Sequence, residues 1–213
     1  MKKLLLVLVS LGIAAFTGRA ELAITASGGQ PAAGKALVEV RRDETGKQSN
    51  WRLFYVSSGS DKGRRDVGQV FVVPGKEGDS VTVNALSLVV ADIPIGEDAP
   101  GAEISLAIHD YSTGILASTP TLEETGYLPN VLSGKDHLLF KFNPVKLEAG
   151  KRYAFILSFQ APAPKRTINF ETAPKRAYPD GAGLFYGLNA KVGKVTYFEM
   201  EGNLVFTLYT PQE

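Results

Sequence analysis

Residues 147–159 read Leu-Glu-Ala-Gly-Lys-Arg-Tyr-Ala-Phe-Ile-Leu-Ser-Phe. The first half predicts a tight turn, because glycine tolerates the positive φ angle that such turns need. In the second half, large apolar residues fill every other position from Tyr153 to Phe159. Side chains of a β-strand alternate between its two faces, so this period of two predicts a strand with one face in a hydrophobic core.

The same period recurs along the rest of the chain. It is strong at 104–108 and 204–208, and weaker in seven further segments, 36–41, 51–57, 67–73, 138–143, 166–172, 183–188 and 195–200. Between residues 81 and 90 the apolar residues change from odd to even positions, which predicts a β-bulge near Asn84. Apart from a short helical turn expected within 121–132, no segment predicts a helix. About ten short strands separated by turn residues predict an all-β fold, a jelly-roll-like antiparallel β-sandwich.

The chain begins with a segment of different character. Lys2 and Lys3 precede an apolar run of 13 residues that ends near Gly18-Arg19-Ala20, and this layout is typical of a secretory signal peptide. We therefore expect a signal peptide at 1–20, a flexible leader at 21–35 and a single sandwich domain at 36–213. The protein would be secreted or periplasmic, with no membrane insertion after cleavage, because the apolar run is too short to span a bilayer.

Composition excludes several classes of function. The chain has no cysteine, so it holds no disulfide, thiolate metal site or thiol nucleophile. Removal of the signal peptide leaves 20 basic and 22 acidic residues, a formal net charge of −2, which argues against a nucleic-acid partner. Only two histidines are present, His109 and His137, and no hydrolase, phosphate-binding or metalloprotease motif occurs. The sequence thus predicts a non-catalytic protein.

Three segments resemble a known group of domains. The pattern Leu-x-Ala-Gly-x-x-Tyr-x-Phe at 147–155, the strand 68–74 (Gly-Gln-Val-Phe-Val-Val-Pro) and the last strand 204–209 (Leu-Val-Phe-Thr-Leu-Tyr) occur in order. Together they are similar to secreted bacterial jelly-roll domains of the galactose-binding-like and carbohydrate-binding-module type, many of them uncharacterised. The resemblance covers roughly residues 50 to 210 and implies a jelly-roll fold with carbohydrate as the ligand.

Such domains often have an acidic residue at the start of the last strand, where this chain has Asn203. That difference weakens the transfer of a calcium site. Asp66, Asp92, Asp136 and Asp180 lie in or beside predicted turns and are the candidate ligands of a structural calcium ion. The competing interpretation is that they cap turns, since no Asp-x-Asp-x-Asp loop is present. We therefore expect no cofactor.

Sugar recognition commonly uses aromatic rings, whose faces stack on the pyranose ring while polar neighbours bind its hydroxyl groups. Phe185 and Tyr186 are adjacent in a strand, so one of the two should point outward. For every ring, burial in the core is the competing interpretation. The candidate ligand-binding residues are Trp51, Tyr127, Tyr178, Asp180, Phe185 and Tyr186.

Three functions remain open at this point. The first is an exported, non-catalytic module that binds carbohydrate or a surface glycan. The second is a structural or protein-interaction module of the cell envelope that uses an exposed strand edge. The third is a hydrolase with an unrecognised carboxylate pair or triad. Neither the identity of the ligand nor the oligomeric state follows from the sequence.

Overall fold

The computed structural model describes residues 21–42, 49–60, 62–189 and 194–212. These residues form β-strands and one short 3₁₀ helix, η1 (Lys175–Ala177). Every pairing between named strands is antiparallel, and the strands form three sheets. The prediction of an all-β fold is therefore confirmed, and the arrangement is consistent with a β-sandwich. The predicted signal peptide, residues 1–20, lies outside the described residues.

The order of the strands across each sheet differs from their order along the chain. The five-stranded sheet contains β1 (Ala23–Ser27), β9 (His137–Glu148), β6 (Ser80–Val89), β15 (Phe206–Thr210) and β2 (Lys35–Val40). The six-stranded sheet contains β13 (Lys194–Met200), β12 (Ala182–Asn189), β5 (Val67–Val72), β10 (Arg152–Phe159), β7 (Glu103–Asp110) and β8 (Leu122–Tyr127). The four-stranded sheet contains β14 (Asn203–Leu204), β11 (Thr167–Ala173), β3 (Ser49–Val56) and β4 (Gly63–Arg65).

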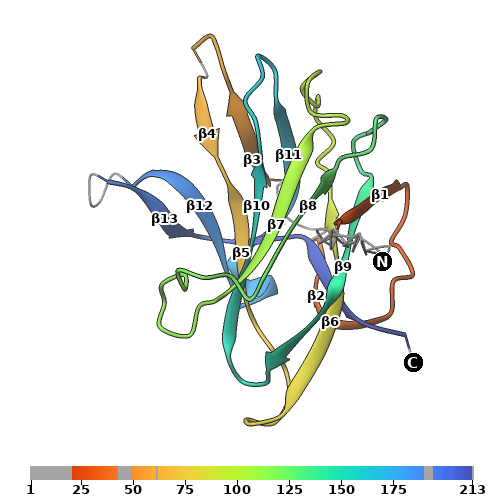
Figure 1. Ribbon diagram of the computed structural model, residues 1–213, viewed down its shortest axis with the longest axis vertical. Helices are drawn as coiled ribbons and strands as arrows, with labels where there is room; N and C mark the ends of the chain where they lie inside the picture. The colour runs from red at the N-terminus through yellow and green to blue at the C-terminus, as the bar shows by residue number, and fades with distance from the viewer. Residues whose placement is uncertain (1–20, 43–48, 61, 190–193, 213) are drawn as a thin grey trace, which may run out of the picture.

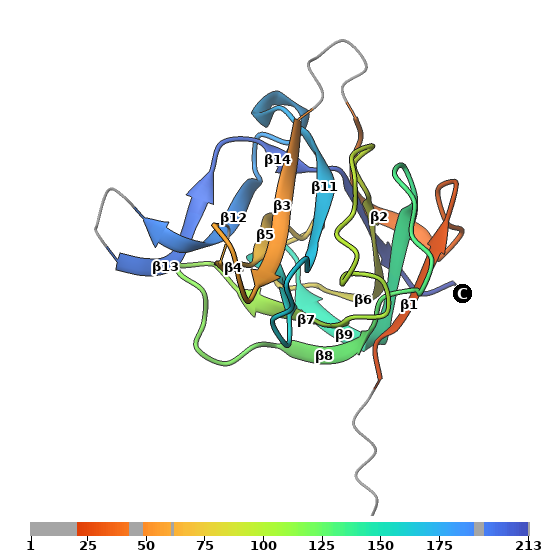
Figure 2. The same ribbon diagram turned by 90° about the horizontal axis from the view of Figure 1, so that it is seen from above.

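Figure 1 shows the β12–β13 hairpin projecting on one side of the molecule and the five-stranded sheet on the other. Seen from above, β3 and β11 of the four-stranded sheet lie between these two ends (Figure 2). All three sheets contribute large rings to one hydrophobic core. The fully buried phenylalanines are Phe71, Phe140, Phe155, Phe159, Phe170 and Phe206.

The turn and strand predicted from residues 147–159 are present. Gly150 has a φ angle of 81°, which allows the tight turn between β9 and β10. Tyr153 and Phe155 then place their rings in the core, with 5% and 1% of their surface exposed. The alternation of apolar residues therefore identified both the strand and its inward face.

The predicted bulge in β6 is also present. The register of β6 against β9 shifts between Val83 and Ala85, on either side of Asn84. Val83 before the bulge and Leu86 and Leu88 after it all point into the core. The extra residue at the bulge explains why the core-facing positions change from odd to even numbers along β6.

The segment 21–35, expected as a flexible leader, contains a strand. Residues 23–27 form β1, which pairs with β9 at one edge of the five-stranded sheet, whereas β2 forms the opposite edge. The connection between them crosses the face of the sheet that is turned away from the core, which we call its outer face. There Ala33 packs on a small apolar cluster, and the Pro31 carbonyl accepts a hydrogen bond from the Tyr209 hydroxyl at 3.2 Å.

The short helical turn expected within 121–132 is likewise absent, because residues 122–127 form the edge strand β8, paired with β7. The short strand β4 was not predicted either, since three residues are too few to show a period. Among the described residues, no helix is long and apolar enough to cross a membrane.

Candidate functional site

Two of the predicted ligand-binding rings lie in the protein interior. Trp51 is 8% exposed and Phe185 is 6% exposed, and their ring centroids are 5.2 Å apart in an edge-on arrangement. Neither ring has a free face on which a sugar could stack. Both predictions are corrected for this reason: in β3 and β12 these positions face the core.

The remaining rings do not form a shared platform. Tyr127 is 60% exposed but stands alone on the edge strand β8. Tyr178 is half-buried, its ring packs against Phe206, and its hydroxyl oxygen accepts a hydrogen bond from the Val72 amide at 2.8 Å. Asp180 is exposed in the turn that follows Tyr178. Among the six predicted residues, Trp51 and Phe185 form a ring contact, and the exposed Tyr127 lies on a different strand.

Tyr186 belongs to a cluster that the sequence did not reveal. Phe185 points into the core whereas Tyr186 is half-buried on the other face of β12, as expected for adjacent residues of a strand. The Tyr186 ring lies 5.1 Å from the Tyr197 ring, and the Arg64 guanidinium carbon lies 5.8 Å from the Tyr186 centroid and 5.5 Å from the Tyr55 centroid. Arg64 is thus surrounded by aromatic side chains.

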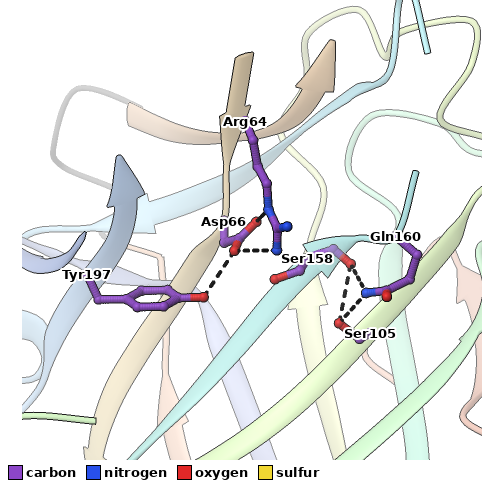
Figure 3. A network of polar contacts seen from close by, with 6 residues as sticks. All are labelled: Arg64, Asp66, Ser105, Ser158, Gln160 and Tyr197. Atoms are coloured by element: carbon purple, nitrogen blue, oxygen red, sulfur yellow. Dashed lines mark hydrogen bonds and ion pairs between the residues drawn. The ribbon is translucent and has the colours of Figure 1, made fainter. Parts of the chain in front are cut away.

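Asp66 fixes the position of Arg64. The carboxylate, 1% exposed, accepts hydrogen bonds from Arg64 Nε at 2.8 Å and Nη2 at 2.9 Å, and from the Tyr197 hydroxyl at 3.0 Å. Figure 3 shows this network beside a second group on the neighbouring strands, in which Gln160 donates to Ser105 Oγ at 2.7 Å. The bidentate pair neutralises Arg64, so the cluster is a structural clamp rather than an open cation site.

Three of the four aspartates considered as calcium ligands, Asp66, Asp92 and Asp136, have separate partners. Asp92 pairs with Lys135 at 2.8 Å, and Asp136 accepts a hydrogen bond from the Ser133 amide at 2.7 Å. Asn203, at the start of the last strand pair, is fully buried and accepts a hydrogen bond from Gln69 at 2.9 Å. Within the described ranges, no three acidic or histidine side chains gather as metal ligands would.

A different site lies on the outer face of the five-stranded sheet. It is a groove of about 490 Å³, which we call the polar groove. Neighbouring strands place Glu39, Thr207 and Ser87 directly opposite one another, and the connection between β1 and β2 adds Gln30. The lining residues are Gln30, Glu39, Val40, Arg41, Arg42, Ser87, Val89, Lys135, His137, Glu171, Val205, Phe206 and Thr207.

One end of the polar groove is built around Glu171. This residue lies on β11 opposite the core-facing Phe170, and its side chain is 8% exposed. Arg42 Nη1 lies 3.5 Å from Glu171 Oε1, and Arg42 Nη2 is buried without a hydrogen-bond partner among the described residues. A buried carboxylate and a guanidinium with an unused donor thus meet in one depression, which favours the binding of a polar group.

The other end combines an amide, a hydroxyl group and a second ion pair. Gln30 Nε2 donates to Glu39 Oε1 at 3.2 Å and to Thr207 Oγ1 at 3.5 Å, while Arg41 Nη2 donates to Glu39 Oε2 at 2.9 Å. The hydrogen bond from Arg41 lowers the pKa of Glu39 below its usual value. Glu39 therefore stays ionised and accepts hydrogen bonds over a wide pH range.

His137 gives the groove a pH-dependent component. Burial lowers the pKa of His137 from 6.5, although Glu171 and Asp136 oppose this effect. Because the folded state favours the neutral ring, the unfolded state takes up the proton first when the pH falls below about 6.5. The free energy of unfolding should therefore decrease from neutral pH into this window, and His137→Gln should remove that part of the decrease.

Urea denaturation at several pH values measures the effect. The variant His109→Gln retains His137 and is the matched control for the loss of a histidine. An identical pH dependence in the native protein and in His137→Gln would contradict the assignment.

The sequence offered little sign of the groove. Glu171 alternates with apolar residues in β11, a pattern typical of a solvent-facing position, and nothing in it indicates burial. Gln30 lies in the predicted leader and Arg42 in a basic pair that is typical of a loop. Gln30 reaches the groove because β1 pairs at one edge of the sheet and its connection crosses to β2 at the other edge, and the pairing of β1 with β9 is long-range.

No family of known proteins matches this sequence, and neither does any curated protein. The functional argument therefore rests on the geometry of the polar groove.

Proposed function

We propose that this chain is an exported, non-catalytic β-sandwich module of the jelly-roll type that binds carbohydrate in the polar groove. The observation that carries the proposal is the set of side chains in one depression of about 490 Å³, which combines carboxylates, guanidiniums, an amide and hydroxyl groups. A sugar presents hydroxyl groups that both donate and accept, so it needs a surface with both capacities. The polar groove offers both.

Binding in the groove would rely on hydrogen bonds more than on ring stacking. The five aromatic candidates include no pair of exposed, parallel rings, and the half-buried pair Tyr186 and Tyr197 is inclined by 51°. By contrast, the carboxylates of Glu171 and Glu39 both line the groove and can accept hydrogen bonds, and each is paired with an arginine. Preoriented polar groups bind with less loss of side-chain entropy.

A glycan array probed with the purified protein, followed by affinity electrophoresis with any polysaccharide that binds, tests the proposal. Glu171→Gln and Gln30→Ala should each weaken binding by about tenfold or more. The first replaces a charged acceptor oxygen by a donor, and the second removes an amide from the groove. Gln30 is exposed, so its substitution does not threaten the fold. The matched control is Glu123→Gln, which makes the same change at an exposed position of β8.

Binding that survives in both groove variants, or no binding to any glycan, would refute the proposal. Tyr186→Ala provides a further comparison, since loss of binding in that variant alone would place the ligand at the arginine–tyrosine cluster. Release of sugar from a bound polysaccharide would instead identify a hydrolase.

A second function, a structural or protein-interaction module of the cell envelope, is favoured by strand β8. This strand forms an edge of the six-stranded sheet, and Tyr127 is 60% exposed on it. Edge strands can accept a strand from a partner. An envelope protein whose binding is lost in Tyr127→Lys but kept in Glu171→Gln would favour this function over carbohydrate binding.

A further inference from the structure

Arg42 and Glu171 leave each other's hydrogen-bonding capacity partly unused at their end of the polar groove. Arg42 Nη1 and Glu171 Oε1 are 3.5 Å apart, whereas an ordinary N–H···O hydrogen bond measures about 2.7–3.2 Å. Arg42 Nη2 has no hydrogen-bond partner within the described part of the chain. Both residues line the groove. A guanidinium donor and a carboxylate acceptor therefore lie side by side, and each can bind a further group.

Two valines flank this ion pair. The bridge between Val90 and Phe170 is antiparallel, so it places Val89 opposite Glu171 on the outer face. The Val205 amide donates a hydrogen bond to the Glu171 carbonyl oxygen at 2.9 Å. Val89 and Val205 both line the groove, and they keep 9% and 7% of their surface exposed. A donor, an acceptor and a small apolar surface thus meet at one place.

The substituents that distinguish common sugars differ in how they match these three features. A carboxylate only accepts hydrogen bonds and would be repelled by Glu171, whereas an ammonium group only donates and would be repelled by Arg42. A hydroxyl group donates and accepts, but it has no apolar part to cover the valines. An acetamido group carries an N–H donor, a carbonyl acceptor and a methyl group, so it matches all three.

We propose that the polar groove selects sugars that carry an acetamido group, and that this group binds at Arg42 and Glu171. Its N–H donates to the Glu171 carboxylate, its carbonyl oxygen accepts from Arg42 Nη2, and its methyl group packs against Val89 and Val205. Nη2 is buried, so the guanidinium turns slightly to present it, and the long contact with Glu171 favours that turn. A buried donor without an acceptor is unfavourable, and the bound carbonyl removes this cost. The inference rests on the proposed function, because it names the class of sugar that the same groove binds.

Binding to polyacrylamide conjugates of monosaccharides, measured by biolayer interferometry, tests this inference. The conjugates of N-acetylglucosamine and N-acetylgalactosamine are compared with those of glucose, galactose, glucosamine and galactosamine, which differ from them only at carbon 2. At least one acetamido conjugate should bind about tenfold or more tightly than its hydroxyl and amine counterparts, because only the acetamido group satisfies both Arg42 and Glu171.

Arg42→Met removes the guanidinium and keeps a long side chain, so it should bring the acetamido conjugate down to the affinity of the hydroxyl conjugate. Arg152→Met is the matched control: Arg152 also pairs with a glutamate, at 3.3 Å, its side chain is 37% exposed against 33% for Arg42, and it does not line the groove. Val89→Thr leaves the ion pair intact and provides a second variant if Arg42→Met does not fold. It places a hydroxyl group beneath the ligand's methyl group and should reduce the acetamido preference about threefold.

Equal binding of acetamido and hydroxyl conjugates by the native protein would overturn the inference. An acetamido preference that survives in both Arg42→Met and Val89→Thr, or that is lost equally in Arg152→Met, would overturn it as well. A protein that binds other glycans of the array but neither acetamido conjugate would overturn this inference and leave the proposed function in place, whereas no binding to any glycan would refute both. Acetyl-trialanine amide presents the same amide without a sugar, so displacement of the bound conjugate by this peptide at equal concentration would assign the groove to a peptide instead.

Discussion

Replacement of Gly183 by alanine is expected to lower the free energy of unfolding by about 3 kcal/mol. A β-carbon added at Gly183 would lie 1.8 Å from Trp51 Cη2 and 2.1 Å from Cζ3, far inside contact distance. The Trp51 ring has no room to retreat, because it is 8% exposed and packs edge-on against Phe185. The two β-strands would have to separate, or the ring would have to leave its rotamer.

Urea denaturation measures this effect, with Gly187→Ala as the matched control. Gly187 lies on the same strand, and a β-carbon there meets no atom within 4 Å. The control should therefore change stability little, or increase it slightly by restricting the unfolded chain. In the double variant Gly183→Ala with Trp51→Phe, the smaller ring should recover part of the loss, because the two sites are in direct contact. Equal stability of Gly183→Ala and Gly187→Ala would contradict the close approach.

For Trp51, Phe185 and Tyr186, the sequence could indicate which face of a strand each ring occupies. Burial in the core was the competing interpretation for Trp51, and the structure agrees with it. The alternation across Phe185 and Tyr186 predicted that one ring points outward, and Tyr186 does. Both conclusions depend on the two-residue period of a strand, which is local and therefore readable from sequence.

The errors have a common physical cause. Strand β1 has small side chains, Ala-Ile-Thr-Ala-Ser, and its apolar period is weak. It forms because β9 offers an unpaired edge more than 100 residues away, at Leu138 and Phe140. Strand β8 contains Glu-Glu-Thr-Gly, which is unusual for a strand, and is held by β7 on one side. Pairing with a distant strand determines that β1 and β8 are strands, and the local propensities of their residues do not predict that pairing.

The candidate site was missed for the same reason. Glu171, Arg42 and Gln30 come from three distant segments, and each has an ordinary explanation in its own segment. Contacts between these segments, such as the ion pair of Arg42 with Glu171, bring them into one groove. Arg64 was nearer to detection, since it lies in the short basic stretch Arg64-Arg65. What the sequence did not show is that the buried Asp66 carboxylate holds Arg64 through two hydrogen bonds.

Asp66, the carboxylate partner of Arg64, is the site of the second substitution with a large expected effect on stability. Asp66→Ala is expected to lower the free energy of unfolding by about 3 kcal/mol, because it leaves the Arg64 guanidinium and the Tyr197 hydroxyl without their acceptor. The Asp66 carboxylate is 1% exposed, and the Arg64 side chain is 40% exposed. This partial access to water places the expected cost at the lower end of the range for buried ion pairs. Asp92→Ala, which breaks an exposed pair with Lys135, is the matched control and should cost much less.

A second substitution separates loss of the pair from general damage. Arg64→Met in the Asp66→Ala background removes the unpaired cation, so it should recover part of the stability that Asp66→Ala loses. Tyr197 provides an independent reading of the same contact. Burial raises its pKa, and the charge and hydrogen bond of Asp66 raise it further, so Asp66→Ala should lower the pKa of Tyr197 in an ultraviolet titration. If Asp66→Ala and Asp92→Ala cost the same and the tyrosine titration does not move, the clamp does not stabilise the fold. If only the stability falls, the loss arises from packing around β5, and the Arg64 pair contributes little to it.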